Sequence, residues 1–296
     1  MHNKHILLLS DRSADTCTFN LAGELRRHFS AAGMNVIEVT AHTLTNPRYL
    51  ANAHCVVLPG IVGEECFYRE QIGDLGFERL KRYVHGGGQL MGFCAGSYVL
   101  FDKSVYTPEV GKGSPREKSS LVALIPGEAR GPIPSSALKR QDLPATYCTL
   151  TRISTPDTLF GNAVGSETPE RIFHLCYAGG PAYHIPENVP HTVLARFTDV
   201  AGKPPAIVEY PYGEGKIIAS AVHPEFGSSM AEVEALSARG TEHRQLMELK
   251  ADLLPYEDER RFFMTQLFDR FKNAEANTVS HPTKDAEFPL TAPAHI

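Results

Sequence analysis

A cysteine enclosed by small residues is the first group in this sequence that could act as a nucleophile. Cys94 follows the apolar run Leu90–Phe93, which predicts a buried strand, and it lies between Gly92 and Gly96. Ser97–Phe101 then predicts the first turns of a helix. A sharp turn from strand to helix exposes a nucleophile at its tip, and it needs small neighbouring residues because the two backbones come close. The N-terminus of the helix also favours an ionised thiol. The alternative is a structural cysteine in a glycine-rich turn.

A histidine and a carboxylate at the end of a later strand could complete a catalytic set. The apolar run Lys216–Val222 predicts a strand that ends in His223, Pro224 and Glu225. Side chains at positions i and i+2 of an extended chain project to the same side, and the proline keeps the residue before it extended. Glu225 could therefore orient the His223 imidazole, which would take the proton of the cysteine thiol.

Taken together, Gly92–Tyr98 and His223–Glu225 resemble the class I glutamine amidotransferase superfamily. The sequence is most similar to the amidotransferase-like domain at the N-terminus of eukaryotic biotin-protein ligases and to its stand-alone bacterial relatives. The resemblance covers roughly residues 5–228 and includes three shorter pieces, Val57–Gly60, Gly86–Gly88 and Cys176–Gly180. In the intracellular-protease and chaperone branch of the superfamily a histidine directly follows the nucleophile, whereas this sequence has an alanine there.

The resemblance implies a Cys94, His223 and Glu225 triad that attacks a carboxamide carbon. The tetrahedral oxyanion would bind the backbone N–H of Ala95 and that of Gly60 or Ile61. Ile61 stands where the family usually has a second glycine, and a β-branched residue does not readily adopt positive φ, which counts against a flipped peptide at this donor. The substrate-binding positions that the resemblance implies are Gly96, Tyr68, Tyr177, Gly179 and Gly180.

The composition limits the classes of partner and the compartment. The chain has 296 residues and a net charge of −5, which gives no electrostatic case for binding nucleic acid or an anionic membrane. It contains no apolar run long enough to span a bilayer and no apolar start long enough for a signal peptide. The six cysteines show no metal-ligand spacing, so we expect no metal, reduced thiols and a cytoplasmic protein. Cys94 is expected to be the most reactive thiol, with Cys55 and Cys176 buried.

Alternating strand and helix patterns predict the fold class, a doubly wound, mostly parallel α/β sheet of the flavodoxin-like type that class I glutamine amidotransferases share. In such sheets ligands bind beyond the carboxyl ends of the strands, where Pro59-Gly60, Cys94 and His223 all fall. The predicted strands are 6–9, 34–39, 55–58 and 90–93, and the predicted helices between them are 19–29 and 77–84.

Three further regions complete the expected organisation. Residues 1–228 form the amidotransferase-like domain, with an irregular or short-stranded insertion at about 103–150. Residues 192–197, 205–210 and 215–222 predict a β-meander that leads into the His-Pro-Glu segment. Residues 229–275 predict helices that pack on the core, with a break at Pro255. Residues 276–296 are expected to form an extended tail.

Three classes of function remain open at this stage. The first is an amidase, or the glutaminase subunit of an enzyme whose synthetase or ligase is a separate partner chain. The second is a regulatory module that senses a small molecule in the same pocket, and the third is a thiol hydrolase of another amide or ester. The sequence contains no phosphate-binding loop and no recognisable biotin-ligase catalytic module, and we expect no cofactor. The expected substrate is a small amide such as glutamine.

Overall fold

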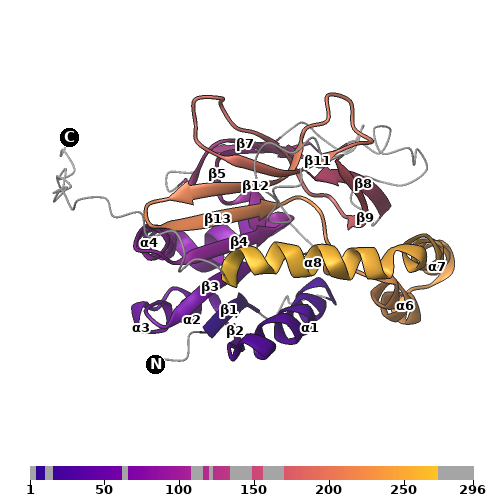
Figure 1. The fold of residues 1–296 in the computed structure, drawn as a ribbon, viewed down its shortest axis with the longest axis horizontal. Coiled ribbons are helices and arrows are strands. Elements are labelled where there is room, and N and C mark those ends of the chain that lie inside the picture. The colour runs from indigo at the N-terminus through magenta and orange to yellow at the C-terminus, as the bar shows by residue number, and fades with distance from the viewer. Residues whose placement is uncertain are drawn as a thin grey trace.

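Nine strands form the main sheet of the computed structural model, which describes residues 5–10, 16–61, 66–107, 116–119, 123–133, 149–155 and 170–272. Their order across the sheet is β2-β1-β3-β4-β13-β12-β11-β8-β9 (Figure 1). The strands are β1 (His5–Leu9), β2 (Asn35–Val39), β3 (Ala53–Leu58), β4 (Gln89–Phe93), β8 (Thr149–Thr155), β9 (Arg171–Tyr177), β11 (Thr192–Phe197), β12 (Pro205–Tyr212) and β13 (Gly215–Ser220).

The sheet has a parallel half and an antiparallel half that meet at β13. Strands β2, β1, β3, β4 and β13 are all parallel to one another. From β13 outward, β12, β11, β8 and β9 pair antiparallel, and the predicted meander is confirmed as β11, β12 and β13. The predicted α/β class is therefore confirmed, with the parallel strands gathered around the segments that were expected to carry the site.

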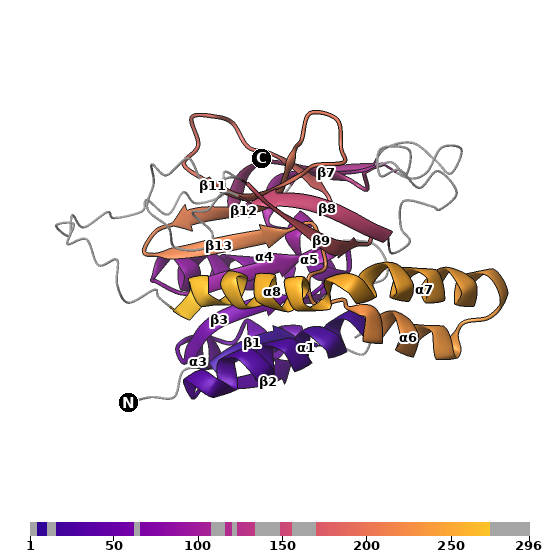
Figure 2. The ribbon, with the colours of Figure 1, turned by 45° about the vertical axis from the view of Figure 1, so that its right-hand side comes forward.

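Helices cover both faces of the parallel half. In both views α1 and α8 lie side by side in front of the sheet, whereas α4 lies behind it (Figures 1 and 2). No helix in the described ranges has the length and apolar character needed to cross a membrane. The helices are α1 (Thr16–Phe29), α2 (Ala41–Leu44), α3 (Pro47–Leu50), α4 (Cys66–His85), α5 (Ala95–Tyr98), α6 (Ser228–Ser237), α7 (Gly240–Leu253) and α8 (Glu257–Lys272).

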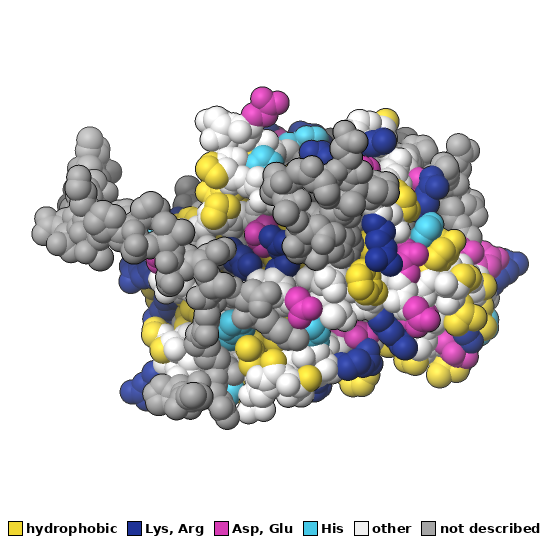
Figure 3. Space-filling model, viewed as in Figure 1, with side chains coloured by type: hydrophobic (Ala, Val, Ile, Leu, Met, Phe, Trp, Pro, Cys, Tyr) yellow, Lys and Arg dark blue, Asp and Glu magenta, His cyan; other side chains and the backbone are white. Residues whose placement is uncertain are grey.

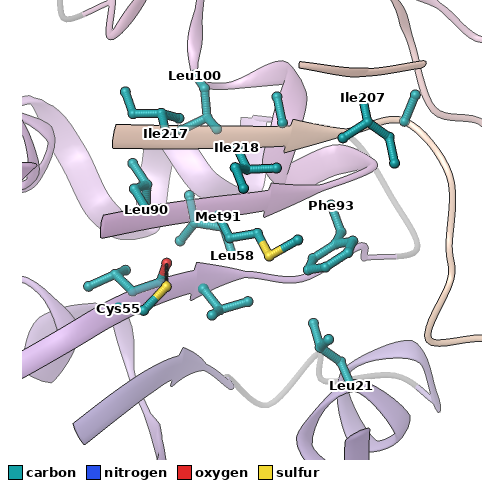
Figure 4. Packing of buried hydrophobic residues seen from close by; sticks show 14 of the residues in the cluster. Leu21, Cys55, Leu58, Leu90, Met91, Phe93, Leu100, Ile207, Ile217 and Ile218 are labelled. Atoms are coloured by element: carbon teal, nitrogen blue, oxygen red, sulfur yellow. Dashed lines mark hydrogen bonds between the residues drawn. The ribbon is translucent and has the colours of Figure 1, made fainter. Parts of the chain in front are cut away.

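Continuous apolar runs make the central strands suitable for burial on both faces. Every residue of β3 and β4 is buried. Figure 4 shows how their side chains pack against those of β13, and how Phe93 lies on the side of the sheet that faces Leu21 of α1. Cys55 and Cys176 are buried as predicted, and burial raises the pKa of the Cys55 thiol well above its ordinary value.

A second sheet has four strands in the order β10-β7-β5-β6, of which β5, β6 and β7 lie in or overlap the predicted insertion. These strands are β5 (Phe101–Tyr106), β6 (Arg116–Ser119), β7 (Ile125–Gly131) and β10 (Ala182–His184). The expectation of short strands is confirmed for residues 116–119 and 125–131, whereas residues 108–115 and 134–148 lie outside the described residues. The tail at 276–296 lies outside them as well.

The predicted helix at 97–101 is wrong beyond its first turn. Helix α5 ends at Tyr98, and Phe101 already begins β5. Leu100 and Phe101 are fully buried, and the Leu100 carbonyl accepts hydrogen bonds from Leu124 and Ile125 of the second sheet. A run of residues whose side chains are buried on all sides has no face exposed to solvent. It therefore fits a strand between two layers better than a helix on the surface.

The C-terminal helices pack on the core as predicted, although the first of the two expected helices is divided. Ala238 and Arg239 are extended between α6 and α7, and Gly240 begins α7 with φ of 57°. Helix α8 buries Phe263, Leu267 and Phe271 in the main core, and α7 buries Leu249 and Leu253 in a smaller cluster. Charged side chains of both signs are spread over the face in Figure 3, with hydrophobic side chains also visible over α6 and α7.

A group of charges joins the end of α8 to the antiparallel strands. Arg270 donates two hydrogen bonds to the Glu209 carboxylate, at 2.8 and 2.9 Å, and Lys216 lies 3.5 Å from the same carboxylate. Burial acts to raise the pKa of Glu209, but the Arg270 bonds and Lys216 outweigh it and hold that pKa below its ordinary value. Ionised Glu209 therefore stabilises the fold, and this contribution is lost as the pH falls through the lowered pKa.

Replacing Glu209 by glutamine is expected to lower the free energy of unfolding by about 1–3 kcal/mol at pH 7, because Arg270 and Lys216 lose a partly buried partner. The difference from wild type should shrink as the pH falls below the ordinary pKa of a glutamate and through the lowered pKa of folded Glu209, because the wild-type carboxylate is then protonated as well. Urea unfolding across this pH range measures it. Glu78→Gln is the control, because the Glu78–Lys81 pair is wider, at 3.8 Å, and more exposed, and should contribute less than ~0.5 kcal/mol. Equal effects of the two substitutions would contradict the prediction.

Candidate active site

The carboxyl ends of three neighbouring parallel strands bring the predicted site together. Leu58 at the end of β3 pairs with Gly92 on β4, and Phe93 at the end of β4 pairs with Ser220 at the end of β13. Gly60, Cys94 and His223 follow these strand ends within three residues. The sheet register therefore places segments that are far apart in the sequence at one edge, where α/β proteins bind ligands.

Cys94 has a strained backbone at the turn between β4 and α5. Its φ is 46° and its ψ is −111°, and Lys203 is the one other described non-glycine residue with a positive φ. The close approach of strand and helix explains the glycines on either side. A Cβ at Gly92 would lie 2.4 Å from the Gly96 carbonyl oxygen, and a Cβ at Gly96 would lie 2.3 Å from that of Leu58. Larger residues at either position would force the strand and the helix apart.

His223 and Glu225 interact as the sequence predicted. The His223 Nδ1 atom lies 2.7 Å from Glu225 Oε1, and both residues are buried. The His223 N–H donates to the Cys176 carbonyl at 2.8 Å, and its own carbonyl accepts from Phe226 at 3.0 Å. The carboxylate next to Nδ1 favours the tautomer that carries its proton there, which leaves Nε2 as the basic nitrogen.

Gly60 lies next to both Cys94 and His223. A Cβ added at Gly60 would lie 2.5 Å from His223 Cε1 and 3.3 Å from Cys94 Cβ. Both side chains therefore pack over the same backbone position. The Ala95 N–H is the first of a helical turn and has no acceptor within that turn. Ile61 does not have a positive φ and packs against the core, so its peptide keeps a conformation that a β-branched residue adopts readily.

A loop after β9 lies against the cysteine. The Cys94 thiol donates to the Ala178 carbonyl at 3.2 Å, and the Tyr98 hydroxyl donates to the Gly179 carbonyl at 3.1 Å. Gly179 has φ of 79°, and a Cβ at Gly180 would lie 1.9 Å from the Ala221 carbonyl oxygen. These glycines are thus required by the fold itself, because the loop passes directly over the end of β13. Their predicted contact with a substrate stays a prediction.

The two tyrosines that were predicted to bind substrate are fully buried. The Tyr68 hydroxyl donates to the Pro59 carbonyl, next to Gly60. The Tyr177 hydroxyl donates to Gly180 at 2.8 Å and accepts from the Ile133 N–H at 2.7 Å. In this structure both side chains support loops that border Cys94, and direct contact with a substrate stays a prediction.

Sequence reasoning missed a chain of hydrogen bonds that ends at the Cys94 carbonyl. The Tyr183 hydroxyl donates to Ser97 Oγ at 2.8 Å, and Ser97 Oγ donates to the Cys94 carbonyl at 2.7 Å. Burial raises the pKa of Tyr183 and of Tyr98 well above the ordinary value, so both hydroxyls remain donors at neutral pH. Across the described ranges no three His, Cys, Asp or Glu side chains form a group that could hold a metal ion.

Gly60→Ala is expected to disturb the site more than the fold. The new methyl group would meet the His223 ring at 2.5 Å, so the imidazole must move away from its present position. We expect a loss of unfolding free energy of about 1–3 kcal/mol and a clear fall in Cys94 reactivity, measured by thermal unfolding and by iodoacetamide labelling. The control is Gly23→Ala in α1, where nothing lies within 4 Å of the added atom. Unchanged labelling of the Gly60 variant would show that His223 does not assist the thiol.

The mixed α/β fold, with helices on both faces of its parallel half, is similar to that of a solved glutamine amidotransferase. Among solved structures, a glutamine amidotransferase from Thermotoga maritima superposes with a TM-score of 0.54. It is 14% identical, and the match covers 92% of this chain and 100% of the other. At this identity the likeness concerns the fold alone.

The sequence shows which family the chain belongs to. The sequence model of the family described as "Biotin-protein ligase, N terminal" matches residues 6–289, and the chain belongs to this family. An uncharacterized protein from Chlamydia muridarum is 27% identical over 248 residues, which cover 81% of this chain and 88% of that protein. A biotin–protein ligase from Schizosaccharomyces pombe is 23% identical over 197 residues, 64% of this chain, and the match spans only 28% of that ligase.

Proposed function

We propose that this protein is a cysteine-dependent amidase that releases ammonia from a small carboxamide, with glutamine as the first candidate substrate. The observation that carries the proposal is the packing of Cys94 and His223 over Gly60, with Glu225 bonded to His223 Nδ1 at 2.7 Å. A nucleophile, a base and a group that orients the base form the set that acyl transfer requires. The strained Cys94 backbone adds support, because such strain collects at functional sites.

The first half of the proposed reaction forms a thioester. His223 Nε2 takes the Cys94 proton, and the sulfur attacks the carboxamide carbon. The negative charge moves to the carbonyl oxygen, which would accept from the Ala95 N–H and from Gly60 or Ile61. The carbon–nitrogen bond then breaks, and the amide nitrogen takes the proton from His223 and leaves as ammonia. Because the thiol now donates to the Ala178 carbonyl at 3.2 Å, its hydrogen must turn toward His223 before transfer.

The second half regenerates the enzyme. A water molecule gives a proton to His223 and attacks the thioester carbon. The carbon–sulfur bond breaks, and the Cys94 sulfur recovers the proton from the imidazolium as the carboxylic acid leaves. Removal of one oxyanion donor from such a site typically costs ~3 kcal/mol of transition-state stabilisation.

The proposed partners follow from the chemistry of the product. If the ammonia is used, its acceptor would be activated by a separate synthetase or ligase chain. A catalytic cysteine must stay reduced, so the proposed compartment is the cytoplasm.

A silent regulatory module is the second candidate. It is favoured by Ile61, which replaces the expected glycine beside Gly60, and by the family's association with biotin-protein ligases. A thiol hydrolase of another amide or ester remains the third candidate.

Ammonia release from glutamine, with and without cell extract, tests the proposal. We expect release by the wild type and none by Cys94→Ala. A chloroketone analogue of glutamine should alkylate Cys94, and added glutamine should protect it. Rapid reaction of Cys94 with iodoacetamide but not with the chloroketone would assign a different substrate. A Cys94 that reacts no faster than an exposed thiol would overturn the enzyme and favour the regulatory module.

A further inference from the structure

We infer that Arg260 of α8 is a positioning residue for the His223–Pro224–Glu225 turn, an inference that rests on the proposed catalytic function. Arg260 is buried, although charged side chains are almost never buried without partners. One guanidinium nitrogen donates to the Pro224 carbonyl at 2.7 Å. Pro224 lies between His223, the proposed base, and Glu225, the carboxylate that orients it. Arg260 therefore binds the middle of this turn.

Two acidic side chains from different helices hold Arg260 in place. Glu24 of α1 accepts from its Nη2 atom at 3.2 Å, and Glu257 of α8 accepts from Nε and Nη2 at 3.1 and 3.0 Å. The other charged groups that meet these carboxylates are Arg27, at 2.5 Å from Glu24, and Arg261, at 3.9 Å from Glu257. Nε and Nη2 of the planar guanidinium are thus held by the two carboxylates, and Nη1 donates to the turn.

The same helices also hold the backbone that follows Pro224. Asn20 of α1 donates to the Glu225 carbonyl, and Glu257 accepts from the Ser228 N–H. Gly227 lets the guanidinium approach, since a Cβ there would lie 2.8 Å from Arg260 Nε. Side chains of α1 and α8, which lie side by side in Figures 1 and 2, therefore fix the turn at three backbone groups.

This arrangement matters because His223 and Glu225 lie just beyond the end of β13, where the parallel ladder no longer fixes the backbone. Small displacements of catalytic groups by distant substitutions can cost up to about a hundredfold in rate. Arg260 touches neither Cys94 nor the substrate in the proposed reaction. It acts by keeping the imidazole at Gly60 and beside the thiol.

The test compares the pH profile of Cys94 alkylation by iodoacetamide in the wild type, Arg260→Gln and Arg260→Lys. Arg260→Gln should slow labelling at pH 7 by roughly tenfold or more and move the profile toward that of an unassisted thiol. Arg260→Lys, which keeps the charge but loses the planar fork, should recover part of the rate. Arg261→Gln is the matched control, because Arg261 is the exposed neighbour on the same helix, and its profile should not change.

Asn20→Ala keeps the inference testable if Arg260→Gln does not fold. It removes one bond to the same turn and should shift the profile in the same direction by a smaller amount. Arg260 variants that fold, as judged by thermal unfolding, and label Cys94 at the wild-type rate would overturn the inference while leaving the proposed function intact. A wild-type Cys94 that reacts only as an ordinary thiol would instead overturn the proposed function.

Discussion

His223→Ala is expected to slow the alkylation of Cys94 by roughly tenfold or more, because the imidazole assists removal of the thiol proton. The contrast should be largest near pH 6.5, where an unassisted thiol, with an ordinary pKa of about 8.5, is almost fully protonated. Limiting iodoacetamide followed by peptide mapping measures the rate for each cysteine. If the protein hydrolyses an amide, the same variant should lose turnover by ~10³-fold or more.

Cys55 and Cys176 provide internal controls for this measurement. Both are buried, and burial raises the pKa of Cys55, so both should label slowly and equally in the wild type and the His223 variant. Glu225→Gln should give an intermediate rate, because the amide can still bond to the imidazole but no longer stabilises its protonated form. If His223→Ala changes nothing, Cys94 and His223 are not a catalytic pair and the regulatory-module proposal leads.

Truncation before Ser228 is expected to prevent cooperative folding. Helix α8 alone buries five large side chains in the main core, namely Phe263, Met264, Leu267, Phe268 and Phe271. At ~2 kcal/mol for each buried side chain, this burial is comparable with the 5–15 kcal/mol that stabilises a typical protein. Thermal unfolding followed by circular dichroism should show no cooperative transition for residues 1–227.

Single substitutions on the same helices test this account without removing a whole segment. Leu267→Ala should lower the free energy of unfolding by about 2–5 kcal/mol, because its side chain is fully buried. Leu236→Ala on α6 should change it by less than ~0.5 kcal/mol, because Leu236 is 74% exposed. A truncated protein with an unchanged melting temperature would show that these helices serve a partner instead of the core.

The sequence alone determined that the segments of the parallel half become strands. Apolar runs make up most of these strands, namely Cys55–Leu58 in β3, Leu90–Phe93 in β4 and Ile217–Ala219 in β13, and glycine or proline follows each of the first two closely. Because the carboxyl ends of parallel strands share one edge, the placement of Gly60, Cys94 and His223 at one edge could be predicted without coordinates. The pairing of His223 with Glu225 was predicted as well, although the two residues lie in a turn closed by the Phe226 N–H and the His223 carbonyl, and not in extended chain.

Only the tertiary structure decided the surroundings of these groups. Helix α5 stops after one turn because the Leu100 carbonyl bonds to the start of β7 and Phe101 begins β5 of the second sheet. The local helical pattern does not reveal this sheet. Tyr68 and Tyr177 lie under the loops, and their hydroxyls bond to backbone groups there. Two partners of Arg260, Glu24 and the Pro224 carbonyl, are 236 and 36 residues away in sequence. Pairings over such distances depend on how helices pack on the sheet, and a single sequence carries no local signal for them.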